Sequence, residues 1–194
     1  MNDKLTLNPS TSALLVMDFQ TTIVDGFAAD KDALVERTAS LIDGARQFGT
    51  RVIYVVVGFR AGYPEVSPRN QSFAPIRASG RFAERSAGTE VHPVVAPKPG
   101  DVVVTKHRVS AFAGTDLDMV LRANGVDTLI LCGIATSGVV LSTLRHASDA
   151  DYRLLVVADC CADRDPEVHR VLTEKVFPRQ AAVTTAEAII GAMA

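Results

Sequence analysis

Residues 128–145, TLILCGIATSGVVLSTLR, constrain the fold more than any other stretch, because an apolar run passes through a glycine into an amphipathic segment. Residues 128–132 have the length and apolarity of a strand buried on both faces. Gly133 ends the strand with a residue that tolerates positive φ. Apolar residues then recur at helical spacing from Val140 to Ala147, which predicts a helix with one face packed on a sheet. This order is typical of a parallel α/β unit.

The turn between this strand and helix is the first candidate site. We expect Thr136 or Ser137 to cap the helix with its side-chain oxygen. The amides from Gly138 to Val140 then lack partners within the helix and face the carboxyl end of the strand. Such amides can stabilise a bound carboxylate or a developing oxyanion. Most α/β crossovers have a similar turn and bind nothing, so this stretch alone does not establish a function.

The rest of the chain repeats the alternation of strand and helix. Further apolar or β-branched runs predict strands at residues 13–17, 51–57, 101–105, 153–158 and 181–184. Helical spacing predicts helices at residues 30–48, 116–124, 166–177 and from 186 onward. The alternation predicts an α/β fold of three layers, α/β/α, with a doubly wound, Rossmann-like, mostly parallel sheet. The 194 residues show no linker or repeat, so we expect residues 1–194 to form one domain.

Residues 59–99 are irregular and rich in proline and glycine, which in an α/β domain is typical of a lid or pocket wall. Aromatic residues are interleaved with arginines, which are Arg60, Arg69, Arg77, Arg81 and Arg85. This pattern favours an anionic, partly apolar ligand. The alternative is that the arginines are solvated or pair across a subunit contact.

Charge and apolar runs argue against several classes of partner. A formal net charge of −2 gives no case for nucleic acid or an anionic membrane surface. The longest apolar run is far shorter than the roughly 20 residues that span a bilayer. The first residues lack the layout of a signal peptide, so we expect a cytoplasmic protein that binds a small molecule.

The cysteines and histidines predict neither a disulfide framework nor a metal centre. Cys132, Cys160 and Cys161 are an odd set without metal-ligand spacing, and we expect them to be reduced and buried. The four histidines are scattered over different predicted elements. We therefore expect no metal and no cofactor.

Two other predicted strands end in chemically useful side chains. Asp18 follows the first strand, and Lys106 follows the third. In a doubly wound sheet, ligands bind beyond the carboxyl ends of the strands near the switch point, where both groups would meet the glycine turn. A buried lysine beside a carboxylate holds it ionised or shares its proton, as acid and base chemistry requires. His107 should point to the opposite side of its strand end.

Three segments resemble the signature regions of the isochorismatase-like hydrolase family, which includes the nicotinamidases and N-carbamoylsarcosine amidases. They are VMDFQ at 16–20, VVTKHRVSAF at 103–112 and CGIATSGVVLST at 132–143. The resemblance spans nearly the whole chain and implies a six-stranded parallel sheet and a homodimer or homotetramer. In amidase members it implies a general base matching Asp18, a supporting lysine matching Lys106, and a cysteine nucleophile at the position of Val139.

Valine at this position departs from the amidase pattern, because its side chain has no nucleophilic atom. No cysteine of the chain matches the position; Ser137 is better explained as a helix cap, and Ser142 lies almost a turn further on. Isochorismatases also lack the cysteine, carry glycine there and use the matching Asp as a general acid. The metal-binding residues of nicotinamidases have no counterpart after the second strand. The resemblance thus implies acid–base chemistry without a covalent intermediate.

The sequence therefore predicts a small-molecule hydrolase in which Asp18 and Lys106 activate water or protonate the substrate. The amides of Ala135 and Val139 are expected to stabilise negative charge. The alternative is a catalytically silent family member that binds a small metabolite or serves as an assembly subunit.

Further expectations concern the geometry of this site. We expect Asp18 and Lys106 within salt-bridge reach, with Val139 on the same pocket wall. By resemblance, Phe19, Gln20 and Phe112 are expected to line the pocket. The resemblance also implies a non-proline cis peptide near Ile134-Ala135.

Overall fold

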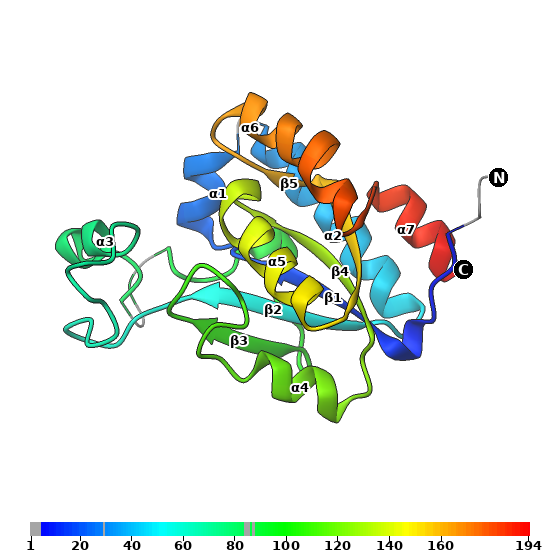
Figure 1. Ribbon diagram of the computed structural model, residues 1–194, viewed down its shortest axis with the longest axis horizontal. Helices are drawn as coiled ribbons and strands as arrows, with labels where there is room; N and C mark the ends of the chain where they lie inside the picture. Colours follow the sequence, from blue (N-terminus) through cyan, green and yellow to red (C-terminus); the bar gives the residue numbers. More distant parts are fainter. Residues whose placement is uncertain (1–4, 29, 84–85, 87) are drawn as a thin grey trace.

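The structure is a computed structural model that describes residues 5–28, 30–83, 86 and 88–194. Its centre is a six-stranded parallel sheet with the order β3-β2-β1-β4-β5-β6 (Figure 1). The strands are β1 (Ser12–Met17), β2 (Arg51–Val57), β3 (Val102–Lys106), β4 (Thr128–Ile134), β5 (Arg153–Ala162) and β6 (Ala182–Thr184). The order reverses between β1 and β4, so the switch point lies at the carboxyl ends of these two central strands.

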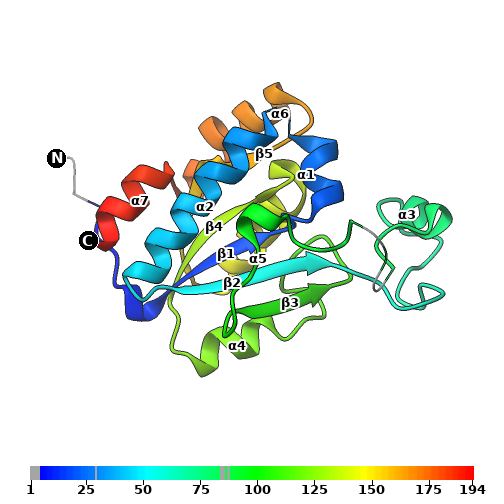
Figure 2. The same ribbon diagram turned by 180° about the vertical axis from the view of Figure 1, so that it is seen from behind.

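Helices cover both faces of the sheet. They are α1 (Thr21–Phe27), α2 (Lys31–Gln47), α3 (Ala74–Ser79), α4 (Leu117–Ala123), α5 (Leu141–Asp149), α6 (Pro166–Val171) and α7 (Ala186–Met193). Helix α5 lies on the face that is in front in Figure 1, whereas α2 and α7 pack together on the face that is in front in Figure 2. The predicted three-layer, Rossmann-like fold is confirmed.

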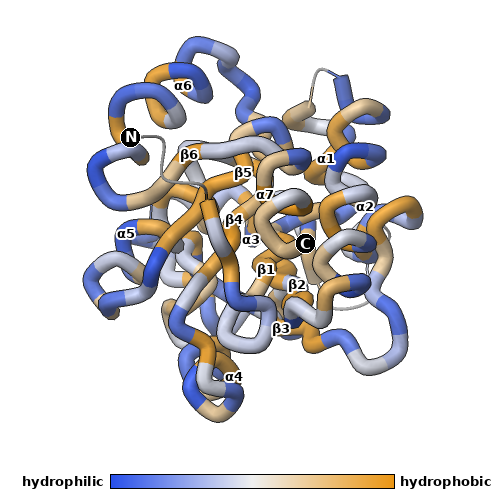
Figure 3. Tube along the Cα trace, turned by 90° about the vertical axis from the view of Figure 1, so that its right-hand side faces the viewer, coloured by the Kyte–Doolittle hydropathy of each residue, from blue (hydrophilic) through white to orange (hydrophobic). Residues whose placement is uncertain are grey.

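The core follows from the apolar runs of the strands. Every residue of β1 and of β4 is buried, as expected for central parallel strands covered on both faces. In Figure 3, hydrophobic strands lie in the interior, and many hydrophilic residues lie in the helices and loops around them. Within the described residues, no helix has the length and apolarity to cross a membrane.

The predicted elements are present, with four main differences. Strand β4 continues through Gly133 to Ile134, so Gly133 does not end the strand as predicted. Strand β5 runs to Ala162, four residues beyond the prediction. The predicted helix 166–177 is α6 followed by a π-helical turn, Leu172–Val176, and a 3-10 turn, Phe177–Arg179. Helices α1 and α3 were not predicted, because both are short and contain helix-disfavouring residues.

Residues 59–83, here called the arm, project beyond the carboxyl end of β2 and carry α3 (Figure 1). Phe59 contacts the rings of Tyr63 and Phe73 at centroid distances of 5.6 Å, and all three side chains are buried. The aromatic residues therefore form the interior of the arm. Its arginines are exposed; Arg85 lies outside the described residues. Association into a homodimer or homotetramer stays a prediction.

Gln20 connects the base of the arm to the chain that returns from it. Its side-chain amide donates to the carbonyls of Val57 (3.0 Å) and Thr89 (2.7 Å), and its oxygen accepts from the Val57 amide (2.8 Å). Gln20 is 1% exposed, so these three bonds satisfy backbone groups that water does not reach.

We predict that Gln20→Ala lowers the free energy of unfolding by about 2 to 3 kcal/mol, because it leaves buried backbone groups unsatisfied. Urea unfolding measures this loss, and hydrogen exchange should show faster opening of residues 88–92. Gln71→Ala is the matched control, since Gln71 is exposed on the arm and should change stability by less than about 0.5 kcal/mol. Equal effects of the two substitutions would contradict the bracing role of Gln20.

Candidate active site

A cavity of about 440 Å³ opens at the switch point, beyond the carboxyl ends of β1, β3 and β4. Four of the predicted residues line it, namely Asp18, Lys106, Ala135 and Val139. Apolar side chains from α1, from the arm and from the end of β4 form much of the remaining wall, including Ile23, Phe27, Phe73, Phe82 and Ile134. The expectation that Val139 shares a wall with Asp18 and Lys106 is confirmed.

Asp18 and Lys106 form a buried ion pair. The Lys106 Nζ lies 2.9 Å from Asp18 Oδ2, and the two side chains are 3% and 7% exposed. The two residues end strands that lie on opposite sides of β2, about 10 Å apart by ordinary strand spacing. The long lysine side chain closes this gap, and its ammonium also donates to the Arg108 carbonyl (3.2 Å).

The two oxygens of the Asp18 carboxyl have different surroundings. Oδ2 binds Lys106, whereas Oδ1 is buried and has no hydrogen-bond partner among the described residues. Burial raises the pKa of this carboxyl above its ordinary value of 3.8, and the charge and hydrogen bond of Lys106 act in the opposite direction. The residue also has a φ of 59°, a conformation that Asp adopts more readily than most side chains. Asp18 is therefore a buried, cavity-lining carboxyl with one unengaged oxygen.

The glycine turn has the predicted position but not the predicted cap. Residues Thr136–Val140 form a π-helical turn that leads directly into α5, and neither Thr136 nor Ser137 caps it with its side chain. The Ala135 carbonyl accepts from the amides of Gly138 (3.1 Å) and Val140 (3.3 Å). Those two amides are therefore engaged within the protein, contrary to expectation. The expected cis peptide bond is present between Ile134 and Ala135.

Three predicted binding residues lie elsewhere: Phe19, Gln20 and Phe112 are not among the described residues that line this cavity. Phe19 is buried in the core, and the Gln20 amide is fully used at the base of the arm. Phe112 stacks on His146, with ring centroids 4.7 Å apart. These side chains serve packing and bracing, and we do not assign them to the cavity.

Phe27 and Arg164 are among the cavity residues that the sequence analysis did not predict. Arg164 follows β5 and its guanidinium lies over the Phe27 ring, 4.5 Å from the centroid. Arg81 of the arm, one of the predicted arginines, also lines the cavity. Asp18 and Lys106 compensate each other, so the two arginines make the cavity net positive. Arg164 lies in a loop without periodic pattern, and only its position after a strand end could have suggested it.

The cysteines are not placed as nucleophiles. Cys132, Cys160 and Cys161 are buried, and none is among the described residues that line the cavity. Burial raises the pKa of Cys132 and of Cys161, and it raises that of Cys160 to about 12. Such thiols are weak nucleophiles, which agrees with the expectation of buried, inert cysteines.

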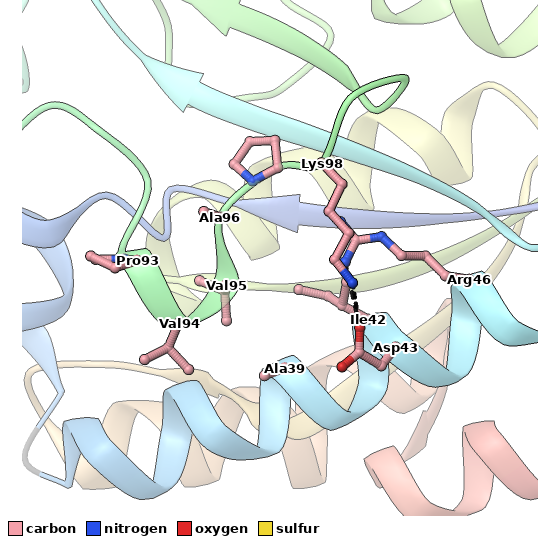
Figure 4. A pocket seen from close by; sticks show the side chains of 10 residues that line it. Ala39, Ile42, Asp43, Arg46, Pro93, Val94, Val95, Ala96 and Lys98 are labelled. Carbon is pink, nitrogen blue, oxygen red and sulfur yellow. Dashed lines mark hydrogen bonds and ion pairs between the residues drawn. The ribbon is translucent and has the colours of Figure 1, made fainter.

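A second cavity, of about 330 Å³, lies between α2 and residues 93–98 (Figure 4). Its polar edge is closed by an ion pair between Lys98 and Asp43 (3.2 Å), and it shares no lining residue with the Asp18 cavity. In the part of the chain that the structure describes, no group of three or more His, Cys, Asp or Glu side chains is arranged to hold a metal ion. The Asp18 cavity is therefore the candidate active site.

Comparison with known proteins identifies the family of this chain. The family model described as an isochorismatase domain matches residues 12–188. The isochorismatase family protein YecD of Escherichia coli O157:H7 is 33% identical over 192 residues, covering 97% of this chain and 100% of YecD. A ureidoacrylate amidohydrolase RutB of Rhizobium rhizogenes is 30% identical, covering 97% of this chain and 82% of RutB.

A crystal structure of a cysteine hydrolase from Pseudomonas syringae pv. phaseolicola 1448A has a similar fold. The TM-score is 0.89 at 25% identity, over 100% of this chain and 98% of that one. With the family model spanning nearly the whole sheet and both strand-end residues, the chain belongs to the isochorismatase family of hydrolases.

Proposed function

We propose that this protein is a small-molecule hydrolase in which Asp18 transfers protons to or from the substrate without a covalent enzyme intermediate. The observation that carries the proposal is the Asp18 carboxyl, which lines the cavity with one oxygen bound to Lys106 and the other unengaged. The residue at the nucleophile position suggested by the motifs is Val139, and valine cannot attack a carbonyl. The reacting oxygen then has to come from water.

Asp18 is suited to proton transfer at its free oxygen Oδ1. A raised pKa leaves a larger share of the carboxyl protonated at a given pH than in an ordinary aspartate, which favours donation to a leaving group. Lys106 opposes this shift and stabilises the carboxylate that remains after the proton has left. Negative charge that develops on the substrate would lie near the backbone of Ala135 and Val139, which we propose as the stabilising groups.

The substrate is proposed to be anionic with an apolar part. Arg81 and Arg164 supply the uncompensated positive charge of the cavity, and its aromatic and aliphatic walls suit an apolar body. The name of the RutB relative, ureidoacrylate amidohydrolase, denotes an anionic substrate of that protein and agrees with this class. The Arg164→Gln variant should weaken binding of a carboxylate compound more than binding of its uncharged amide counterpart.

We predict that Asp18→Asn lowers kcat/KM by about 10²- to 10⁴-fold, because an amide can neither deliver nor accept the proton. Turnover would be measured on a panel of anionic vinyl ethers, amides and esters. Asp32→Asn is the control, since Asp32 is an exposed carboxylate in α2. Absence of turnover by the unmodified protein on every compound would instead favour the silent, ligand-binding alternative.

The raised pKa of Asp18 also predicts a pH-dependent stability. The folded state retains a proton that the unfolded chain loses near pH 3.8, so folding is favoured below that pH and the gain is lost as pH rises through the folded pKa. Relative to Asp18→Asn, the unmodified protein should lose up to about 1.4 kcal/mol per pH unit in this window. Urea unfolding at several pH values measures the difference, and parallel curves for the two proteins would refute the shift.

Thiol chemistry provides an independent prediction. Activity should survive iodoacetamide, because the three native thiols are buried. The Val139→Cys variant should become sensitive, since its thiol would line the cavity near Lys106. Mass spectrometry locates the label. Complete inactivation of the folded, unmodified protein through label at a native cysteine would contradict the non-covalent mechanism.

A further inference from the structure

The turn that forms one wall of the cavity is held from behind by the segment that follows β5. Thr136 is fully buried, and its hydroxyl lies 2.8 Å from the Nδ1 atom of His169 in α6. The neighbouring amide of Ser137 donates to Asp163 Oδ2 at 2.7 Å. Two consecutive residues of the turn are therefore attached to one short stretch, residues 163–169.

These attachments act on the residues that face the cavity. Thr136 and Ser137 lie between Ala135 on one side and Gly138 and Val139 on the other, and all except Thr136 line the cavity. Gly138 has φ −97° and ψ −105°, outside the helical region, so the turn departs from regular helix geometry. A turn of this kind needs contacts from outside to select one conformation.

Of the two attachments, only the hydrogen bond between Thr136 and His169 joins two side chains, so substitution can remove it from either end. His169 is half-buried, and burial lowers the pKa of its ring, while the charge of Asp163 acts in the opposite direction. A ring that is neutral at neutral pH has one acceptor nitrogen. With Nε2 protonated, Nδ1 accepts the hydroxyl hydrogen of Thr136.

We propose that His169 is a positioning residue that fixes the conformation of the turn 135–139 through Thr136 and so sets where Val139 and the backbone of Ala135 face the cavity. His169 touches neither the cavity nor Asp18 in this scheme. The consequence for catalysis rests on the function proposed above, whereas the control of turn geometry does not.

The test uses the Val139→Cys variant as a reporter, because the reactivity and pKa of that thiol depend on its place relative to the turn amides and Lys106. The rate of iodoacetamide alkylation is followed from pH 6 to 10, alone and combined with His169→Leu or His169→Asn. We expect His169→Leu to change the rate at neutral pH by about tenfold, which corresponds to a thiol pKa shift of about one unit. His169→Asn should restore the rate to within about threefold, because its side-chain amide retains hydrogen-bonding groups near Nδ1. His146→Leu, at an exposed histidine of α5, is the control.

A double-mutant cycle separates positioning from general loss of structure. Thr136→Val removes the hydroxyl at constant shape, and its effect on the alkylation rate should not add to that of His169→Leu, because both remove one bond. Additive effects, an unchanged rate in His169→Leu, or no rescue by His169→Asn would overturn the proposal. If His169→Leu does not fold, the alkylation rates of Thr136→Val and Thr136→Ser are compared instead, because only the serine variant keeps the hydroxyl. Alkylation of the reporter thiol needs no substrate, so the test of the His169 proposal does not depend on the Asp18→Asn result.

Discussion

The buried ion pair of Asp18 and Lys106 is the interaction on which the site depends, and it is a costly one. Removing a carboxylate and an ammonium from water costs several kcal/mol for each ion, and their mutual attraction recovers this only with good geometry and further hydrogen bonds. Lys106 has the Arg108 carbonyl as a second acceptor, but Asp18 Oδ1 has no partner among the described residues. We therefore expect the ion pair to contribute little to the stability of the fold. Pairing of β1 and β3 with β2 in the sheet places the two strand ends where the charges meet.

The fold could be predicted from the sequence because the strands of a parallel sheet are nearly continuous apolar runs. Each strand was predicted to end at the first polar residue after its apolar run. This placed the end of β5 too early, because β5 continues past Asp159 to Ala162. The Asp159 carboxylate accepts from the amide of Ala186 at 2.9 Å, so it serves the start of α7 rather than ending the strand. Helix α1 was missed for a related reason. Its β-branched residues and glycine have weak helix propensity, and burial of Ile23 and Val24 overrides it.

The placement of side chains at strand ends could be predicted, because position along a strand determines position in space. Asp18 and Lys106 end strands, and topology alone brings strand ends to one edge of the sheet. The placement of a side chain could not be predicted where it depends on the path of a loop. Gln20 is two residues from Asp18, yet its amide is directed to the base of the arm, and Arg164 reaches the cavity from a loop far along the chain. Loop geometry depends on contacts that no local sequence pattern encodes.

Valine at position 139 changes what the ion pair has to do. With a thiol there, the carboxylate would act first as a base that creates the nucleophile. Without one, the carboxyl must act on water or on the substrate itself, and these roles make opposite demands on its pKa. Burial raises the pKa of Asp18, and this direction suits an acid better than a base. Under the proposed function, this direction favours delivery of a proton from Oδ1 to the leaving group. An anionic group bound beside Asp18 would act in the same direction, because nearby negative charge favours the protonated carboxyl.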